Sequence, residues 1–184
     1  YPNITIKEVI QFLRSLIHEE RMFALLILVR KYSKGNETEK KRIYELYLKH
    51  TKFINNWDLV DGSAQYIVGA FLMNKSKKPL YRLAKSSSLW ERRIAVLSTF
   101  YFIQHHHFSE ALKISEILLT DEQDLIHKAV GWMLREIGKR DITAEETFLK
   151  KYYKNMPRTM LRYAIERFPE SKREKYLRGE YSCD

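Results

Sequence analysis

A tryptophan and two aspartates lie within five positions of one another in the segment NNWDLVD, residues 55–61. Trp57 and Asp61 are four residues apart, so a helix would bring their side chains together on one side. An indole face attracts cations, and a carboxylate stabilises positive charge that develops during a reaction. Asp58 has a simpler explanation, because an aspartate in the first turn of a helix favours the positive end of the helix dipole.

The helix that we expect to begin near Asn56 has a clear apolar stripe. Its members are Val60, Ala64, Ile67 and Phe71. At about 100° per residue, Trp57 lies about 50° and Asp61 about 90° from the direction of this stripe. Asp61 is therefore at the flank of the core, where it either stabilises the helix N-terminus or serves a functional site, and both interpretations stay open.

A second tryptophan, Trp132, lies outside the apolar stripe of the helix predicted over residues 124–139. It is about 120° from that stripe, on the same side as Lys128 and Arg135. A tryptophan flanked by cations is uncommon in a protein without a partner, because large apolar side chains are usually buried. Packing against a neighbouring helix is the alternative.

Arg93 and Trp90 belong to a further predicted helix. Trp90 falls within its apolar stripe, so we expect Trp90 to be buried. Arg93 lies at a flank of the stripe. Helical wheels place the flanks of Arg93 and Asp61 on opposite sides, so they do not by themselves predict that these two residues meet.

The elements that would position these residues are helices. Residues 6–17 carry apolar side chains at i, i+3, i+4 and i+7 spacing, as do residues 60–71 and 126–137. A helix start is expected in DITAEETF, with Thr143 as the cap, and Asp141 and Pro157 mark further starts. No convincing hairpin signal is present, so the sequence predicts an all-α fold.

The helical segments also recur. ERMFALL (20–26) aligns with ERRIAVL (91–97), and further copies follow towards the C-terminus. The matched alanines are Ala24, Ala95, Ala129 and Ala164, with Ala64 in a more divergent copy. A spacing of roughly 34 residues with two helices per repeat is typical of a HEAT-like solenoid, whose concave face is the usual binding surface. We expect residues 1–184 to form one such domain.

Charge and composition narrow the function classes. The 184-residue chain has a formal net charge of +10, which suits a nucleic acid, an acidic membrane surface or an acidic protein as partner, or serves solubility alone. The richest apolar run, residues 22–29, is too short to span a membrane and is expected to be a buried helix segment. The single cysteine, Cys183, excludes an internal disulfide and favours a cytoplasmic location.

Other motifs are weak or missing from the sequence. His105, His106 and His107 are contiguous, so they cannot all face one metal from a helix and are expected in a loop. The chain has no glycine-rich phosphate loop, no Cys-x-x-Cys pair and no nucleophile elbow. The basic segment 171–180 is expected to be a solvated helical tail.

Four segments together resemble the AlkD-like DNA alkylation repair glycosylases. They are NNWDLVD, LWERRIAV, IHKAVGWMLREIGK and MPRTMLRYAIERFPESKREKYL, in this order along nearly the whole chain. The resemblance implies a HEAT-like repeat fold and hydrolytic excision of cationic N-alkylated purines, such as 3-methyladenine and 7-methylguanine, from double-stranded DNA. It also implies that no metal or cofactor takes part, and we expect the protein to act as a monomer.

The resemblance assigns roles to particular residues. Asp61 matches the catalytic aspartate, and Trp57 and Trp132 match the two tryptophans of the active site. The cations expected to contact the DNA backbone are Arg93, Arg135 and Lys128. Family members typically begin with further helices that line the DNA groove, and this sequence begins after them. The alternative function is a helical-repeat scaffold that binds nucleic acid or an acidic protein without catalysis.

Overall fold

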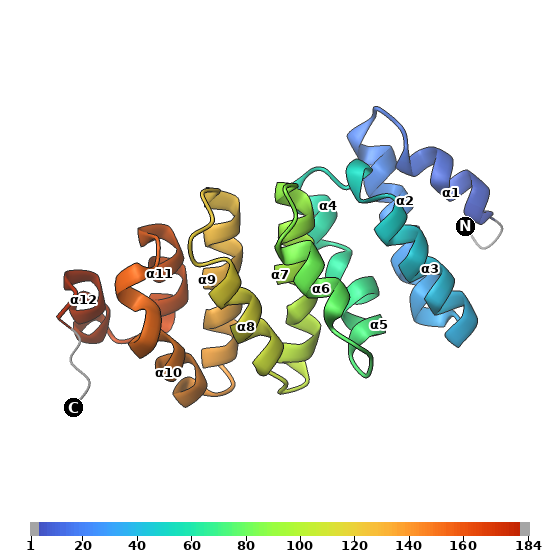
Figure 1. Ribbon diagram of the computed structural model, residues 1–184. Coiled ribbons are helices and arrows are strands. Elements are labelled where there is room, and N and C mark those ends of the chain that lie inside the picture. Colours follow the sequence, from blue (N-terminus) through green and yellow to red (C-terminus); the bar gives the residue numbers. More distant parts are fainter. Residues whose placement is uncertain (1–3, 181–184) are drawn as a thin grey trace.

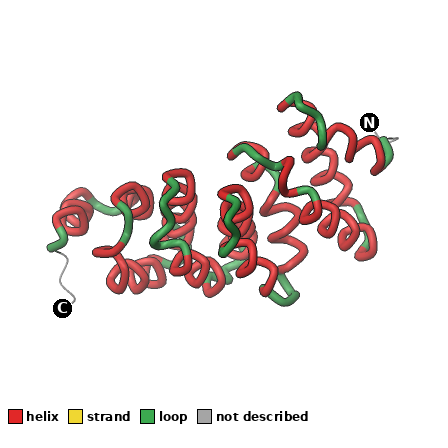
Figure 2. The backbone as a smooth tube through the Cα atoms, turned by 45° about the horizontal axis from the view of Figure 1, so that its top comes forward, coloured by secondary structure: helices red, strands yellow, loops and turns green. Residues whose placement is uncertain are grey.

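The computed structural model describes residues 4–180, which form an array of helices (Figure 1). Within these residues the backbone contains helices and loops but no strand (Figure 2), which confirms the all-α prediction. No helix in the described range is long and apolar enough to cross a membrane. Cys183 lies outside the described residues.

The helices form two layers that run along the array. The first layer consists of α2 (His18–Lys34), α4 (Trp57–Asp61), the π-helix η2 (Gln65–Gly69), α5 (Ala70–Leu72), α7 (Leu89–Gln104), α9 (Asp124–Gly138) and α11 (Arg158–Ala164). The second layer consists of α3 (Glu37–Lys49), α6 (Lys78–Ala84), α8 (Ser109–Ile117) and α10 (Ile142–Tyr152). At the two ends lie α1 (Ile6–Leu13) and α12 (Glu170–Arg178) (Figure 1). Short 3-10 turns occur at Thr51–Phe53, Tyr153–Asn155 and Ile165–Arg167.

The repeat register predicted from the sequence is confirmed by burial. All five matched alanines are buried, at 1% exposure or less, on successive helices of the first layer. Glycines add two further close contacts. A Cβ on Gly69 would lie 2.3 Å from the carbonyl oxygen of Ser98, and a Cβ on Gly131 would lie 2.4 Å from that of Met160. Small residues thus let α7 and α11 approach their neighbours closely, as a stacked helical solenoid requires.

Three local predictions need correction. The helix expected over residues 6–17 ends at Leu13, and residues 14–17 form a loop before α2. The cap of α10 is Asp141 rather than Thr143, because the Asp141 side chain accepts a hydrogen bond from the Ala144 amide. Trp90 is only partly buried, at the edge of the core.

The segment that carries Trp57 and Asp61 is an irregular helix. Asn56 caps it by accepting a hydrogen bond from the Trp57 amide at 2.8 Å. A turn at Gly62 and Ser63 then leads into the π-helix. π-helical turns are frequent beside functional sites. The regular helical wheel therefore applies to residues 57–61 but not to the turns that follow.

Candidate active site

Asp61 and Arg93 meet at the junction between α4 and α7. The Arg93 Nε atom donates to Asp61 Oδ1 at 2.9 Å, and Arg93 Nη2 donates to Asp61 Oδ2 at 2.7 Å. The third guanidinium nitrogen, Nη1, donates to the carbonyl oxygen of Leu125 at 2.5 Å, so α9 joins the same network. This two-pronged arrangement fixes the plane of the carboxylate as well as its position.

The two partners differ in exposure. The Arg93 side chain is 6% exposed, whereas the Asp61 side chain is 18% exposed. The carboxylate therefore stays accessible from one side while the guanidinium is enclosed. We expected Arg93 to contact the DNA backbone, but its guanidinium is directed at Asp61 and Leu125, so that role stays an untested prediction.

A groove of about 330 Å³ lies beside this ion pair. Its lining residues are Trp57, Arg93, Leu125, Lys128, Ala129, Trp132, Arg135 and Tyr163. The structure thus gathers both tryptophans and all three cations named from the sequence in one groove, with Asp61 behind Arg93. The groove comes from the first layer of helices, whose N-terminal ends at α4, α7 and α9 lie along the upper edge of Figure 1.

The two indoles are held differently. Trp57 is 54% exposed at the start of α4 and projects from the wall of the groove. Trp132 is partly buried, its ring centre lies 5.7 Å from that of Phe100, and its Nε1 donates to Glu136 at 3.3 Å. Burial alone would raise the pKa of Glu136, but hydrogen bonds from Lys139 and Arg140 outweigh burial and keep that pKa below its usual value. Glu136 therefore stays charged as an acceptor for the indole.

The cations at the rim have acidic partners in the structure. Lys128 pairs with Asp124 at 2.7 Å, one turn away on α9. Arg135 pairs with Glu166, which lies in the 3-10 turn after α11. Both pairs are partly solvent-exposed, so they contribute little to stability and can open when a phosphate competes for the cation.

Asp58 is separate from the groove. Its Oδ2 lies 2.7 Å from Nε2 of His18 at the start of α2, and its Oδ1 accepts from the Leu59 amide. Asp58 thus ties α4 to α2 and helps to fix the beginning of α4, which agrees with a structural role for this residue.

Tyr163 is a groove residue that the sequence reasoning missed. It is exposed on α11 and faces the groove across from α7. Tyr163 comes directly before the repeat alanine Ala164, and Lys128 comes directly before the repeat alanine Ala129. Tyr163 and Lys128 both line the groove. The repeat register was therefore a signal that could have identified it.

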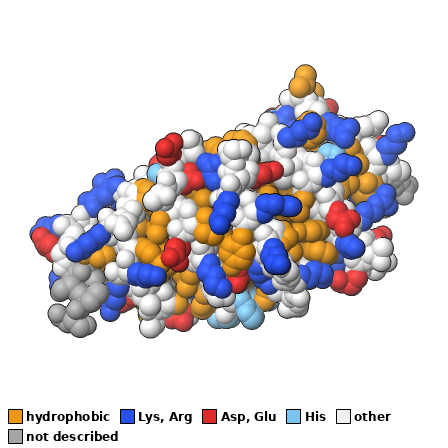
Figure 3. Space-filling model, viewed as in Figure 1, with side chains coloured by type: hydrophobic (Ala, Val, Ile, Leu, Met, Phe, Trp, Pro, Cys, Tyr) orange, Lys and Arg blue, Asp and Glu red, His pale blue; other side chains and the backbone are white. Residues whose placement is uncertain are grey.

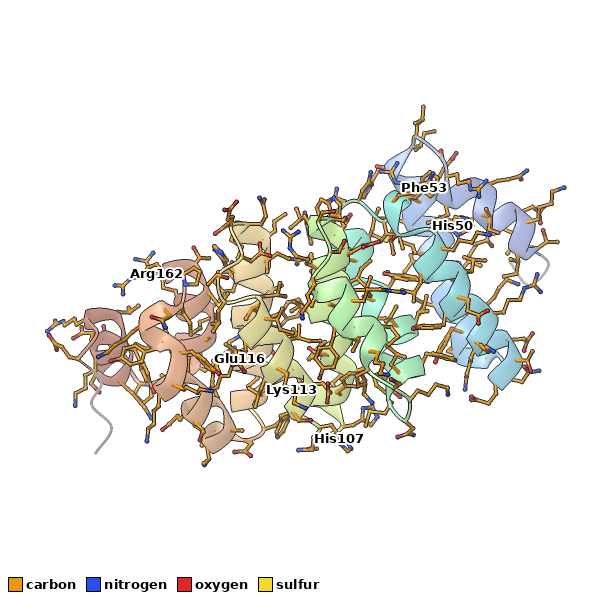
Figure 4. All side chains as sticks on the ribbon, in the orientation of Figure 1. His50, Phe53, His107, Lys113, Glu116 and Arg162 are labelled. Atoms are coloured by element: carbon orange, nitrogen blue, oxygen red, sulfur yellow. The ribbon has the colours of Figure 1, made fainter. Side chains whose placement is uncertain are left out.

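The histidine run does not belong to this site. His105 to His107 follow the end of α7, as expected for a loop. Figure 4 shows His107 at the lower edge of the molecule, whereas Arg162 of α11 lies towards the upper edge. No group of three or more potential metal ligands occurs among the described residues.

The stacked repeats and the tryptophan-lined basic groove define a solenoid-type helical-repeat protein. The chain belongs to the family of DNA alkylation repair enzymes, whose family model matches residues 2–168. The solved structure "Predicted DNA alkylation repair enzyme from Enterococcus faecalis" has a similar fold, with a TM-score of 0.68 and 16% identity over 91% of this chain and 78% of that one. No match was found among curated proteins.

Proposed function

We propose that this alkylation repair protein is a monofunctional DNA glycosylase that hydrolyses the N-glycosidic bond of cationic alkylated purines. The observation that carries this proposal is the Asp61 carboxylate, which Arg93 orients beside a groove containing two tryptophans. The proposal rests on this arrangement together with the family membership.

The substrate needs little help at the base. A purine alkylated at N3 or N7 already carries a positive charge, so it leaves without being protonated. The sugar develops oxocarbenium character as the C1′–N bond breaks, and this charge is what a carboxylate can stabilise. The same carboxylate can orient the water that attacks C1′ and accept its proton.

Arg93 acts as a positioning residue in this mechanism. Each oxygen of Asp61 accepts one hydrogen bond from Arg93, and a carboxylate oxygen can accept a second. The free lone pairs remain available for water or the sugar cation. Because Arg93 is enclosed and the carboxylate is fixed in advance, no reorganisation is needed when charge develops.

Trp57 and Trp132 would frame the cationic base. The interaction of an indole face with a cation is worth about 0.5–2 kcal/mol, depending on how far the site is desolvated. The Glu136 hydrogen bond fixes Trp132, whereas the exposed Trp57 can adjust to the duplex. Lys128 and Arg135 would exchange their acidic partners for DNA phosphates.

A non-catalytic scaffold is the second candidate, and one observation favours it. The Asp61–Arg93 ion pair connects α4 to α7. Arg92, also on α7, forms a similar ion pair in which its Nε lies 2.6 Å from Oδ2 of Asp121. An ion pair that only holds helices together would need no substrate. In this case the groove would bind DNA, and Asp61 would be structural.

Release of free base separates the two candidates. The protein should release 7-methylguanine from methylated duplex DNA and leave abasic sites that alkali cleaves. Unmodified guanine should not be released, because neutral guanine is a poor leaving group. Tight binding to the methylated duplex without any release would support the scaffold and reject the glycosylase.

A further inference from the structure

The loop between α1 and α2 presents two large apolar side chains to solvent. Leu16 is 97% exposed and Ile17 is 55% exposed. The loop stands out at the top of Figure 1, and Figure 3 shows hydrophobic surface at its tip. A leucine with almost no contact to its own chain is unusual beside α1, whose own apolar residues are buried or partly buried against the core.

The loop is held in this conformation by hydrogen bonds. Arg21 Nη1 donates to the carbonyl oxygens of Ser15 at 2.9 Å and Leu16 at 3.1 Å. The Ile17 amide donates to the Ser15 hydroxyl at 3.1 Å. A buttressed loop of this kind presents its apolar tip at little further entropic cost when a partner binds.

The tip lies at the same edge of the molecule as the helix ends that border the groove. Ile17 is followed by His18, which bonds to Asp58, the neighbour of Trp57. Two residues of chain span at most about 7 Å, so Leu16 lies close to the junction of α2 and α4. Figures 1 and 2 show this loop at the same edge as the N-terminal ends of α7 and α9, which border the groove.

The base of the loop is positively charged. The guanidinium of Arg14 and the ammonium of Lys52 lie 5.9 Å and 4.9 Å from the ring centre of Phe53, and Figure 4 shows Phe53 beside this loop. Neither cation forms an ion pair within residues 4–180, and neither does Arg21. Lys128 and Arg135 at the groove, by contrast, are paired. Cations without acidic partners beside an apolar tip are complementary to phosphates beside stacked bases.

We propose that Leu16 and Ile17 form a wedge that inserts between base pairs of the duplex next to the lesion, while Arg14 and Lys52 contact the flanking phosphates. Apolar wedges of this type unstack one base step and bend the duplex. Bending at this end would turn the sugar of the neighbouring nucleotide towards Asp61. The inference rests on the proposed function, because that function makes duplex DNA the partner. It concerns how the duplex is held, not how the base is released.

A duplex that carries 2-aminopurine beside a tetrahydrofuran abasic analogue tests the wedge without requiring base release. We expect the protein to raise 2-aminopurine fluorescence, because unstacking relieves quenching. The Leu16→Ser/Ile17→Ser variant should lose this rise and bind about tenfold more weakly, with the salt slope of binding unchanged. The Arg14→Gln/Lys52→Gln variant should instead flatten the salt slope.

Ile142→Ser is the matched control, because Ile142 is also an exposed isoleucine but lies on α10 in the second layer. It should behave like the parent protein, and all variants should melt at similar temperatures. Parent-like fluorescence and affinity in the Leu16→Ser/Ile17→Ser variant would overturn the wedge. So would a variant that binds and unstacks the duplex as the parent does and loses only its binding to vesicles of anionic lipid. If the parent unstacks the duplex but releases no 7-methylguanine, the glycosylase proposal fails while the wedge stands.

Discussion

Substitution of Asp61 should change the stability of the protein as well as its proposed activity. Asp61 is the last residue of α4, where the helix dipole is negative, so the dipole does not stabilise its carboxylate. The ion pair with the enclosed Arg93 stabilises it instead, and removing the negative charge leaves a guanidinium without its counter-charge, at a cost of roughly 1–3 kcal/mol. Stability and activity must therefore be measured together for any variant of this pair.

Arg93 and Arg135 should respond differently to substitution. Arg93→Lys keeps the charge but loses the two-pronged contact, so single-turnover release of 7-methylguanine should slow by about tenfold or more. Arg93→Gln removes the charge and should still leave the slope of log affinity against log salt unchanged, because the side chain faces Asp61. Arg135→Gln should reduce the magnitude of that slope by about 0.9, one phosphate contact. Equal flattening by Arg93→Gln and Arg135→Gln would mean that Arg93 contacts phosphate and does not position Asp61.

The contact between α9 and α10 contains a buried carboxylate outside the groove. Glu145 is 2% exposed, its Oε1 lacks a hydrogen-bond partner, and its carboxylate occupies the space that a side chain on Gly138 would need. Burial raises the pKa of Glu145 to about 8, and the neighbouring Glu146 adds to the effect. The native state therefore holds a proton that the unfolded chain releases near its ordinary pKa of 4.5.

The proton on Glu145 determines whether the stability of the protein rises or falls with pH. Because the folded state binds more protons, the contribution of Glu145 to stability is present below the unfolded pKa and is lost as the pH rises towards 8. Glu145→Gln should match the parent near pH 5 and exceed it by about 2–4 kcal/mol at pH 8 in denaturant unfolding. Glu146→Gln on the same helix is the comparison, and it should show a smaller gain, because it removes only the charge that adds to the effect of burial and also loses the ion pair with Lys172. A Glu145→Gln variant with the same pH profile as the parent would contradict a protonated Glu145.

At the scale of elements, the sequence predicted the helices that carry the repeat alanines and the starts of two later helices. The buried alanines identified the first-layer helices, and Asp141 and Pro157 were recognised as starts of α10 and α11. The loop at residues 14–17 was missed because its apolar side chains continue the helical period although they face solvent. Periodicity records which residues are apolar, but it does not record which of them the fold leaves exposed.

At the scale of the whole molecule, the site depends on how successive repeats are rotated against one another. A helical wheel describes one helix, so it could not predict that the flanks of Asp61 and Arg93 meet across α4 and α7. Gly69 and Gly131 set the spacing of helices in the first layer, and this spacing is not encoded in any single helix. The resemblance to a known family predicted that the site residues belong to one site, which the helical wheels alone could not predict.

The net charge also acts at this scale. A chain with a formal charge of +10 attracts a polyanion from a distance, whichever sequence the polyanion carries. Beside the groove this charge surrounds one oriented carboxylate, which repels phosphate and, in the proposed reaction, would stabilise a sugar cation. A binding scaffold would use that carboxylate only to hold α4 against α7, so the choice between the two candidate functions depends on what Asp61 does.

The most direct test compares Asp61→Asn with Asp121→Asn in single-turnover release of 7-methylguanine from methylated duplex DNA, beside thermal melting of each variant. Asp121 pairs with Arg92 of the same helix, and Arg92, unlike Arg93, does not line the groove, so both variants deprive an arginine of α7 of its partner but only one of them acts at the groove. We predict that both lose stability, and that only Asp61→Asn slows release, by roughly 100- to 1,000-fold or about 3–4 kcal/mol, without loss of DNA affinity. Release by Asp61→Asn at the rate of Asp121→Asn would contradict a catalytic role for Asp61.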